Sequence, residues 1–314
     1  MLNRRHIRVK VMQTLYAFKR EEGDTFTTDL SFLHTSINGM FTLYLLLISI
    51  LSELQKKGED YLKKSQQKHL ATAADKNPNR KFVNNEILQM LSQNTTLQER
   101  IAKQKIINWD LDSEYIDILF KTLQKSDLYR SYMQTRTSNF TEDKHFIIDI
   151  FKEIIAPNEQ LYSYLEDKNL TWLDDLPAVN TAILKLLRKV NPGTTASHFL
   201  PELCKDKDDL QFAENLLKKT ILNKTKLLKI IEARANNWDT DRIAEIDYTL
   251  LQMGVCEIKY FPSIPVKVTI NEYLEIAKEY STPKSSIFIN GILDKLVKDE
   301  QESGILNKTG RGLM

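Results

Sequence analysis

Residues 237–294 read NWDTDRIAEIDYTLLQMGVCEIKYFPSIPVKVTINEYLEIAKEYSTPKSSIFINGILD, and this stretch decides the fold. Apolar residues recur at helical spacing on both sides of the run PVKVTINE (265–272), and a third apolar segment follows. Thr269 and Glu272 stand in the T-x-x-E order of a capping box, which predicts that a helix begins at Thr269. The stretch has no phosphate-loop or metal-binding motif, so it predicts helices without catalytic chemistry.

The rest of the chain has the same helical character. It has 314 residues, 42% of them hydrophobic, which is enough for one large domain or two. Only 9 Gly and 8 Pro occur, and two-residue alternation of the strand type is scarce, so we predict an all-α protein. The turn Asn191-Pro192-Gly193 favours a boundary. We expect an arginine-rich N-terminal helix, a helical insertion, a C-terminal helical bundle and a flexible tail, at residues 1–22, 23–196, 197–298 and 299–314.

Helical periodicity also predicts the individual helices. The first runs from about Asn3 to Arg20, and a further apolar face follows at Leu210–Asn236. In the insertion the expected helices are Met40–Leu54, Glu86–Ser92, Leu97–Ile107, Ser113–Met133, Lys144–Ile155, Glu159–Lys168 and Ala178–Val190. The most apolar run, Met40–Leu51, is shorter than the roughly 20 residues that span a bilayer.

The N-terminal segment and the cysteines indicate a cytoplasmic protein. The basic residues in the first 20 positions are not followed by the apolar region of a secretory signal. Cys204 and Cys256 are isolated, so they predict free thiols rather than a disulfide framework or a metal knuckle. We therefore expect no membrane attachment and a cytoplasmic location.

All three tryptophans occur in the pattern W-x-x-D, at Trp109/Asp112, Trp172/Asp175 and Trp238/Asp241. One interpretation is a repeated helical unit of about 65 residues, which is longer than the usual repeat period of about 20–50 residues. The other is a local arrangement in which Trp fills a loop and Asp starts the next helix. Little else aligns between the copies, which favours the local interpretation.

Enzyme signatures are missing from the sequence. It has none of the patterns GxxxxGK[ST], GxGxxG, GxSxG and HExxH. The five histidines are scattered without metal-ligand spacing. The pairs Asp174-Asp175 and Asp208-Asp209 fit helix starts better than an acid–base dyad. We therefore predict no catalytic residue, no metal site, no cofactor and no small-molecule substrate.

The N-terminal arginines are the first candidate for ligand binding. Because 44 basic residues face 42 acidic ones, for a net charge of +2, any nucleic-acid site must be local. Arg4, Arg5 and Arg8 lie at a helix start, in a segment that has no acidic residue before position 21. Arginine binds phosphate bidentately and stacks on bases. A charged chain terminus without a ligand is the equally weighted alternative.

The second candidate is the loop and helix start at Lys284-Ser285-Ser286-Ile287-Phe288. Serine hydroxyls and helix N–H groups suit phosphate, Lys284 adds positive charge, and Phe288 offers a ring on which a base can stack. The alternative is an ordinary Ser-capped helix with Phe288 in the core. The residues by themselves favour this second interpretation slightly.

Both ends of the chain resemble the NusB family. The N-terminal similarity covers the arginine-rich run Asn3–Arg8 and the pair Leu15-Tyr16, and the C-terminal similarity follows the string INE…E-x-AK…F-[VI]-NG-x-LD. The C-terminal part comprises Ile246-Asp247, Leu250-Leu251, Glu257, Pro265–Val268, Ile270–Glu272, Glu275, Ala277-Lys278, Phe288–Gly291 and Leu293-Asp294. Residues 24–196 have no counterpart in short members and are similar to the extended form of some bacterial lineages.

The resemblance implies two small helical bundles that bind boxA-type RNA of ribosomal RNA leaders together with NusE, a small-subunit ribosomal protein. This pair joins a complex in which RNA polymerase reads through terminators. The implied RNA contacts are Arg4, Arg5, Arg8, Lys284 and Phe288, and the implied NusE contacts are Tyr16 and Asp247. Asn271 and Glu272 are implied to form the helix start that supports the RNA loop, and Gly291 is expected to allow close helix packing.

The sequence departs from the family pattern at three positions. His6 interrupts an arginine triplet, Ile287 replaces a residue that is often basic, and Lys284 replaces one that is sometimes acidic. A helical adaptor that binds only protein is therefore the alternative function, and a fused RNA methyltransferase is disfavoured because no glycine-rich cofactor motif occurs. We also expect that replacing Arg5 and Arg8 by Ala weakens RNA binding and leaves folding intact.

Overall fold

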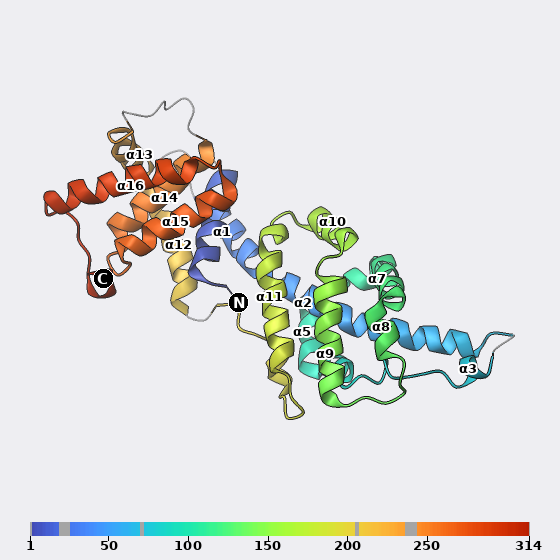
Figure 1. The fold of residues 1–314 in the computed structure, drawn as a ribbon. Helices are drawn as coiled ribbons and strands as arrows, with labels where there is room; N and C mark the ends of the chain where they lie inside the picture. Colours follow the sequence, from blue (N-terminus) through green and yellow to red (C-terminus); the bar gives the residue numbers. More distant parts are fainter. Residues whose placement is uncertain (1, 19–25, 70–71, 205–206, 236–243, 314) are drawn as a thin grey trace. The chain divides into compact units, whose positions relative to one another are not determined.

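The computed structural model describes residues 2–18, 26–69, 72–204, 207–235 and 244–313. These residues form helices, turns and loops without a strand, which confirms the all-α prediction (Figure 1). The chain folds as two compact units. One comprises Leu2–Ile37 and Cys204–Met314 and is called the terminal unit here; the other comprises Asn38–Leu203 and is called the central unit.

The terminal unit is a helical bundle built around one apolar helix. Its elements are α1 (Arg4–Ala17), the first part of α2 (Thr27–Gln66), α12 (Lys207–Leu222), α13 (Lys224–Glu232), α14 (Glu245–Tyr260), α15 (Val266–Tyr280), α16 (Ser285–Glu302) and a 3₁₀ turn at Gly310–Leu313. Helix α14 contacts α1, α12, α13, α15 and α16 and lies among them in Figure 1. Leu250, Leu251 and Val255 of α14 are fully buried, so this helix supplies the centre of the core.

Gly254 lies where α14 makes a tight crossing in the terminal unit. A Cβ atom at Gly254 would lie 3.2 Å from Cδ1 of Leu293 and 3.4 Å from Cδ2 of Tyr273, so a side chain there would press on α15 and α16. Gly291 was expected to allow such packing, but it is exposed, and a Cβ atom there would meet nothing within 4 Å. The prediction for Gly291 is therefore wrong.

Helix α15 begins at Val266 rather than at Thr269. Pro265 occupies the N-cap with φ −62°, and its ring holds the backbone ready to enter the helix. Thr269 is consequently inside the helix, where its hydroxyl donates to Oε1 of Glu257 at 2.8 Å. Glu272 binds Arg5 instead of a backbone N–H group. The capping-box prediction is wrong because the proline starts the helix earlier.

The central unit contains the remaining helices. They are the rest of α2, α3 (Ala73–Lys76), α4 (Glu86–Ser92), α5 (Thr95–Lys103), α6 (Asn108–Leu111), α7 (Glu114–Lys125), α8 (Asp127–Tyr132), α9 (Phe140–Ile150), a π-helical turn (Phe151–Ile155), α10 (Glu159–Lys168), α11 (Trp172–Lys189) and a 3₁₀ turn (Ala196–Phe199). Helices α4 and α10 match their predicted bounds. The helix predicted over 113–133 is divided at Ser126, whose hydroxyl accepts the N–H of Tyr129 at 3.1 Å and caps α8.

Helix α2 is much longer than the predicted Met40–Leu54 and carries the core of the central unit. Its most apolar window has a mean hydropathy of 1.7 and is long enough to cross a membrane, but 78% of that window is buried inside the protein. The core helix of a water-soluble protein has this character, and the finding is weak support for a membrane span.

Two of the W-x-x-D tryptophans anchor α6 and the start of α11 to α2. The indole N–H of Trp109 donates to the carbonyl of Leu46 at 3.1 Å, and that of Trp172 donates to the carbonyl of Gly39 at 3.0 Å. Trp238 and Asp241 lie outside the described residues. The two described copies thus place tryptophan against one common helix.

The two units do not begin and end where the predicted segments do. The structure divides the chain after Ile37, inside α2, and after Leu203, before α12. The sequence analysis placed the corresponding boundaries after residues 22 and 196. The four segments proposed there, 1–22, 23–196, 197–298 and 299–314, stay predictions. Residues 299–314 were expected to be a flexible tail. Helix α16 continues to Glu302, and the residues that follow contact the loop between α14 and α15, including a hydrogen bond from the Thr309 N–H to the Pro262 carbonyl at 3.0 Å.

Candidate nucleic-acid interface

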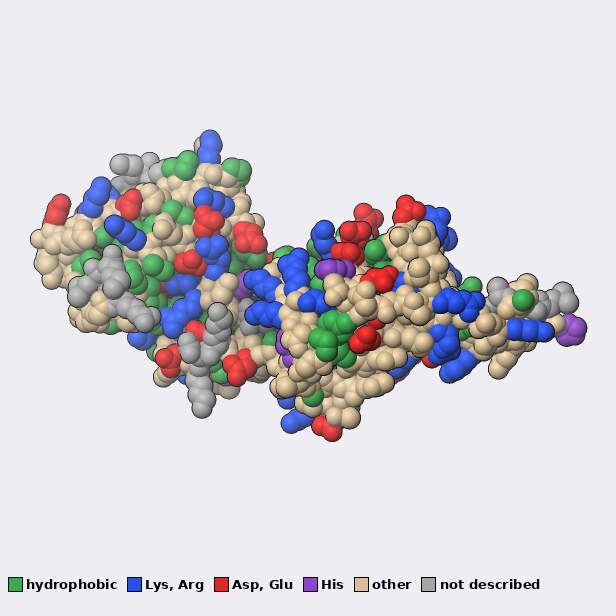
Figure 2. Space-filling model, turned by 60° about the horizontal axis from the view of Figure 1, so that its bottom comes forward, with side chains coloured by type: hydrophobic (Ala, Val, Ile, Leu, Met, Phe, Trp, Pro, Cys, Tyr) green, Lys and Arg blue, Asp and Glu red, His purple; other side chains and the backbone are tan. Residues whose placement is uncertain are grey.

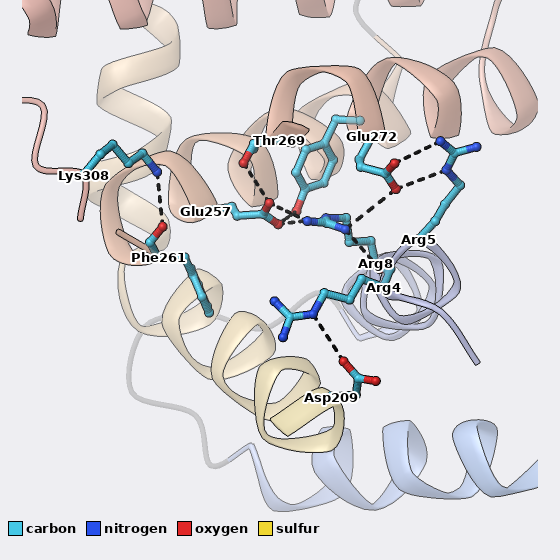
Figure 3. A network of polar contacts seen from close by, with 10 residues as sticks. Arg4, Arg5, Arg8, Asp209, Glu257, Phe261, Thr269, Glu272 and Lys308 are labelled. Carbon is cyan, nitrogen blue, oxygen red and sulfur yellow. Dashed lines mark hydrogen bonds and ion pairs between the residues drawn. The ribbon is translucent and has the colours of Figure 1, made fainter. Parts of the chain in front are cut away.

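Helix α1 places the three candidate arginines at its N-terminal end. Asn3 caps the helix, because its Oδ1 accepts the N–H of His6 at 2.9 Å. The helical spacing then directs Arg4, Arg5 and Arg8 toward three other helices (Figure 3). The structure therefore brings these arginines together as predicted, and each of them meets a carboxylate.

Arg8 lies in the interior of the terminal unit. Its side chain is 2% exposed, and that of its partner Glu257 is 0% exposed. The guanidinium donates from Nε to Oε2 of Glu257 at 2.9 Å and from Nη2 to Oε1 at 2.6 Å, which is a bidentate pair. Arg8 therefore joins α1 to the central helix α14 rather than presenting its charge to solvent.

The same carboxylate is satisfied on its other side by helix α15. The hydroxyl of Tyr273 donates to Oε2 of Glu257 at 3.2 Å, in addition to the bond from Thr269. Burial by itself would lower the pKa of Arg8, but the attraction and hydrogen bonds of Glu257 outweigh it and raise that pKa above its ordinary value. Burial also raises the pKa of Tyr273 well above its ordinary value. Arg8 thus remains charged inside the bundle.

Arg4 lies at the rim of the same network. Its side chain is 45% exposed, and its Nε donates to Oδ1 of Asp209 on α12 at 3.2 Å. The guanidinium carbon also lies 5.0 Å from the ring centroid of Phe212, within cation–π range. A guanidinium has five N–H donors, and the ion pair with Asp209 uses only the one on Nε. Arg4 is therefore placed to bind an anion from solvent.

Arg5 is the second rim residue, with a side chain that is 41% exposed. It donates from Nε and Nη2 to the two oxygens of Glu272 on α15, at 3.1 and 2.9 Å. The hydrogen bond to Glu272 is the main reason that the pKa of Arg5 is raised. Three arginines thus face three carboxylates, and the charge of the cluster is balanced locally.

The second candidate region, between α15 and α16, is held by Asp247. The carboxylate accepts the hydroxyl of Ser281 on Oδ1 and the hydroxyl of Ser285 on Oδ2, each at 2.6 Å. Asp247 and Ser285 are buried, so the first turn of α16 is tied to the start of α14. The structure gives Ser285 this role in place of the predicted side-chain cap, because no side-chain cap bond is present at α16.

Lys284 and Phe288 differ in accessibility. Lys284 is exposed at the N-cap of α16, whereas Phe288, one turn later, is buried in the core. The phenylalanine ring therefore follows the alternative interpretation of the sequence, in which it packs inside the protein. Ile287 is exposed between them.

Tyr16 and His6 are two further residues of α1 that the sequence analysis singled out. Tyr16, a predicted partner contact, is half exposed on the last turn of the helix. His6 is partly buried, and burial, together with the positive charges of Lys10 and Arg5, lowers its pKa. His6 is consequently neutral at pH 7 and adds no charge to the arginines. Lys19 and Arg20 lie outside the described residues.

A pocket of about 850 Å³ opens beside the rim arginines. It is lined by Asn3, Arg4, Arg5, Arg8, Ser263, Ile264, Pro265, Val268, Glu272, Thr309 and Gly310. Lys284 does not line it, so the two predicted RNA-binding regions do not share this pocket. On the face drawn in Figure 2, basic side chains are interspersed with acidic ones.

The structure does not contradict the predictions that the two cysteines are free thiols and that the protein has no metal site. Cys204 and Cys256 are both free, and burial raises the pKa of the Cys256 thiol to about 12. Within the described ranges, no group of three or more His, Cys, Asp or Glu side chains is arranged to hold a metal ion.

Sequence reasoning missed several residues of this region. Asp209 and Glu257 neutralise arginines, and Thr309 and Gly310 line the pocket from the far end of the chain. A signal for Glu257 was present, since it is the one acidic residue in the apolar run LLQMGVCEI (250–258). A charge in such a run calls for a buried partner.

Comparisons with known proteins agree with the resemblance. The NusB family model matches residues 185–298. The transcription antitermination protein NusB of Salinibacter ruber is 45% identical over 112 residues, which cover 36% of this chain and 70% of that protein. The NusB protein of Finegoldia magna is 41% identical over 110 residues, 34% of this chain and 80% of that protein.

This chain belongs to the NusB family. The NusB protein of Chloroherpeton thalassium is also similar, with 38% identity over 129 residues that cover 41% of this chain and 61% of that protein. No solved structure matches. The residues matched by the NusB family model lie mostly within the terminal unit, so most of the central unit lies outside the match.

Proposed function

We propose that this protein is a transcription antitermination factor that binds boxA-type RNA of ribosomal RNA leaders together with NusE, and that it supports read-through by RNA polymerase. The observation that carries the proposal is the match of residues 185–298 to the NusB family and to relatives named transcription antitermination proteins. The role is one of binding, without catalysis, and the proposed location is the cytoplasm.

Arg4, Arg5 and Lys284 are the proposed RNA contacts. All three have solvent-accessible side chains with N–H donors, and phosphate contacts of this kind supply most of the affinity for nucleic acid. Arg8 and Phe288, although implied by the resemblance, are buried, so their proposed part is to hold the surrounding helices.

The proposed NusE contact is Tyr16, with Asp247 acting indirectly. Tyr16 is half exposed, and an aromatic side chain of that kind is a frequent anchor in protein interfaces. Asp247 is buried and binds Ser281 and Ser285, so it supports the loop that carries Lys284. NusE is proposed to complete the RNA surface, because the arginines alone face balancing carboxylates.

A specific observation also favours the second candidate, a helical adaptor that binds only protein. Arg4, Arg5 and Arg8 each pair with a carboxylate, and Asp209, Glu257 and Glu272 cancel their charge within the cluster. A surface without net positive charge attracts RNA weakly.

One titration separates the two functions. A fluorescently labelled boxA RNA and a scrambled RNA are titrated with the full-length protein, with and without NusE of the same organism, and anisotropy is recorded. The proposal expects tighter binding to boxA than to the scrambled RNA when NusE is present. Binding to neither RNA, while NusE still binds, would overturn it in favour of the adaptor.

A further inference from the structure

The pocket beside Arg4 and Arg5 has a wall that comes from the C-terminal segment of the chain. The start of α1 forms one side, Pro265, Val268 and the first turns of α15 form another, and Thr309 and Gly310 close a third. All of these residues belong to the terminal unit. The volume of about 850 Å³ lies in the range of about 300–1,000 Å³ typical of ligand pockets.

Residues 303–313 return to the bundle by a defined path. Gly304 has a φ of +63° just after α16, and the N–H groups of Ile305 and Leu306 both donate to the carbonyl of Glu300, at 2.9 and 3.2 Å. The chain then runs back to the loop before α15. There the Lys308 ammonium donates to the carbonyl of Phe261 at 3.2 Å (Figure 3). These contacts hold the segment against the mouth of the pocket.

Two further glycines in the segment are required by its conformation. Gly310 has a φ of +54°, a region that favours glycine. A Cβ atom at Gly312 would collide with the backbone carbonyl oxygen of Pro262, so any side chain there forces the segment away from the loop. The family match ends at residue 298, so the segment itself lies outside the matched residues, whereas Phe261 and Pro262, which it contacts, lie inside them.

The lining of the pocket has the chemistry of a nucleotide site. Guanidinium groups of Arg4 and Arg5 lie on one side and suit a phosphate. Pro265 and the half-exposed Val268 offer an apolar surface for the face of a base. Thr309 brings a hydroxyl to the third wall. Glu272 also lines the pocket, and its charge is matched by the bidentate pair with Arg5.

We propose that residues 303–313 complete this pocket and that it holds one nucleotide of single-stranded RNA. The inference rests on the proposed function, since it assigns a new part of the chain to the same RNA surface. The C-terminal segment then acts as a wall that confines the nucleotide against the arginines, and its displacement weakens RNA binding without disturbing the helical bundle.

The test compares full-length protein with two variants of the segment. In one, the chain stops after Ser303; in the other, Gly312→Ala displaces the segment from Pro262. Gly291→Ala is the matched control, because a Cβ atom there meets nothing within 4 Å. Each segment variant should lose one or two hydrogen bonds to the RNA. With NusE present, we therefore expect both variants to bind boxA RNA roughly threefold to tenfold more weakly than the wild type. Their unfolding temperatures should be unchanged. The control binds like the wild type.

A second readout locates the nucleotide. RNA that contains 4-thiouridine is photo-crosslinked to the full-length protein, and the expected adducts include peptides from residues 303–314. Weaker binding without such adducts would overturn the pocket, because the segment would then act from a distance.

The failure of this inference differs from the failure of the proposed function. Unchanged or tighter binding by both segment variants, with normal binding by the wild type, overturns the pocket and leaves the proposed function standing. Tighter binding in particular would mean that the segment blocks the site. Absence of RNA binding by the wild type overturns the proposed function and the pocket with it.

Discussion

The interior and the rim of the arginine network differ although they come from the same turns of α1. Arg8 is enclosed with Glu257, Thr269 and Tyr273, whereas Arg4 and Arg5 pair with carboxylates while more than a third of each side chain meets solvent. An enclosed charge stabilises the fold only while its partner is present. A rim charge contributes little to stability and is available to a ligand. Arg8 therefore belongs to the fold, and the exposure of Arg4 and Arg5 supports their proposed role in binding.

The largest expected effect follows from breaking the interior pair. Arg8→Ala leaves the buried Glu257 carboxylate without its charged partner, and loss of one member of a buried pair costs about 3–5 kcal/mol. We expect this decrease in the free energy of unfolding by urea denaturation. Because Arg8 is enclosed, we now expect the double replacement of Arg5 and Arg8 to impair folding, contrary to the expectation from the sequence.

A double variant tests whether the charge or the packing matters. Arg8→Met combined with Glu257→Leu removes both charges and keeps apolar volume, so it should be more stable than Arg8→Ala. If Arg8→Ala alone loses less than about 1 kcal/mol, the pair is not enclosed as described and the comparison fails.

Asp247 extends the comparison to the second candidate region. Asp247→Ala removes the acceptor of two serine hydroxyls in a buried position, which predicts a loss of about 1–3 kcal/mol in the free energy of unfolding. Asp247→Asn keeps one acceptor oxygen and should lose less. Were Asp247 a direct NusE contact, its replacement would weaken NusE binding and leave stability unchanged.

The sequence predicted helices where local patterns decide the structure, and it misplaced a helix start where they do not. Apolar periodicity was enough to predict α4 and α10, and the string INE…E-x-AK…F-[VI]-NG-x-LD was enough to identify the family. The start of α15 was misplaced because the T-x-x-E pattern describes a local bond, whereas Thr269 and Glu272 are used by Glu257 and Arg5 from other helices. Pro265 starts the helix earlier, and partners on other helices take up the two side chains.

The candidate site was predictable only in part, for a related reason. A cluster of arginines in sequence indicates charge, but burial decides what each arginine does, and burial depends on residues more than 200 positions away, such as Asp209 and Glu257. The C-terminal wall of the pocket gave a weaker signal. Gly310 and Gly312 are informative only once their φ and their neighbours are seen.

The rim prediction concerns RNA rather than stability. Replacing Arg4 and Arg5 by Ala together should weaken boxA binding on the order of tenfold, or about 1.4 kcal/mol, and reduce stability by at most about 1 kcal/mol. Each lost phosphate contact should also make the slope of log K against log salt less negative by about 0.7. Binding is measured by anisotropy at several salt concentrations.

Arg130→Ala is the matched control for the rim. Arg130 forms an exposed ion pair with Asp127 in the central unit. The Arg130→Ala variant therefore loses an exposed arginine and an ion pair, as the Arg4 and Arg5 variant does. It should bind RNA like the wild type with an unchanged salt slope. An equal loss of RNA affinity in Arg130→Ala would mean that only the net charge of the protein matters. Arg4 and Arg5 would then have no specific role in RNA binding.

The smallest expected effect belongs to His6, which lies between the interior and the rim. Burial and the charges of Lys10 and Arg5 lower its pKa in the folded protein, so the unfolded chain binds the proton more readily. The contribution of neutral His6 to stability is therefore complete above the unfolded pKa, near 6.5, and is lost as pH falls through the lower folded pKa. His6→Gln cannot titrate, and its free energy of unfolding should fall less than that of the wild type between pH 7.5 and pH 5. Equal decreases in both proteins would mean that His6 is solvated like the rim and not held in its neutral form by the helix.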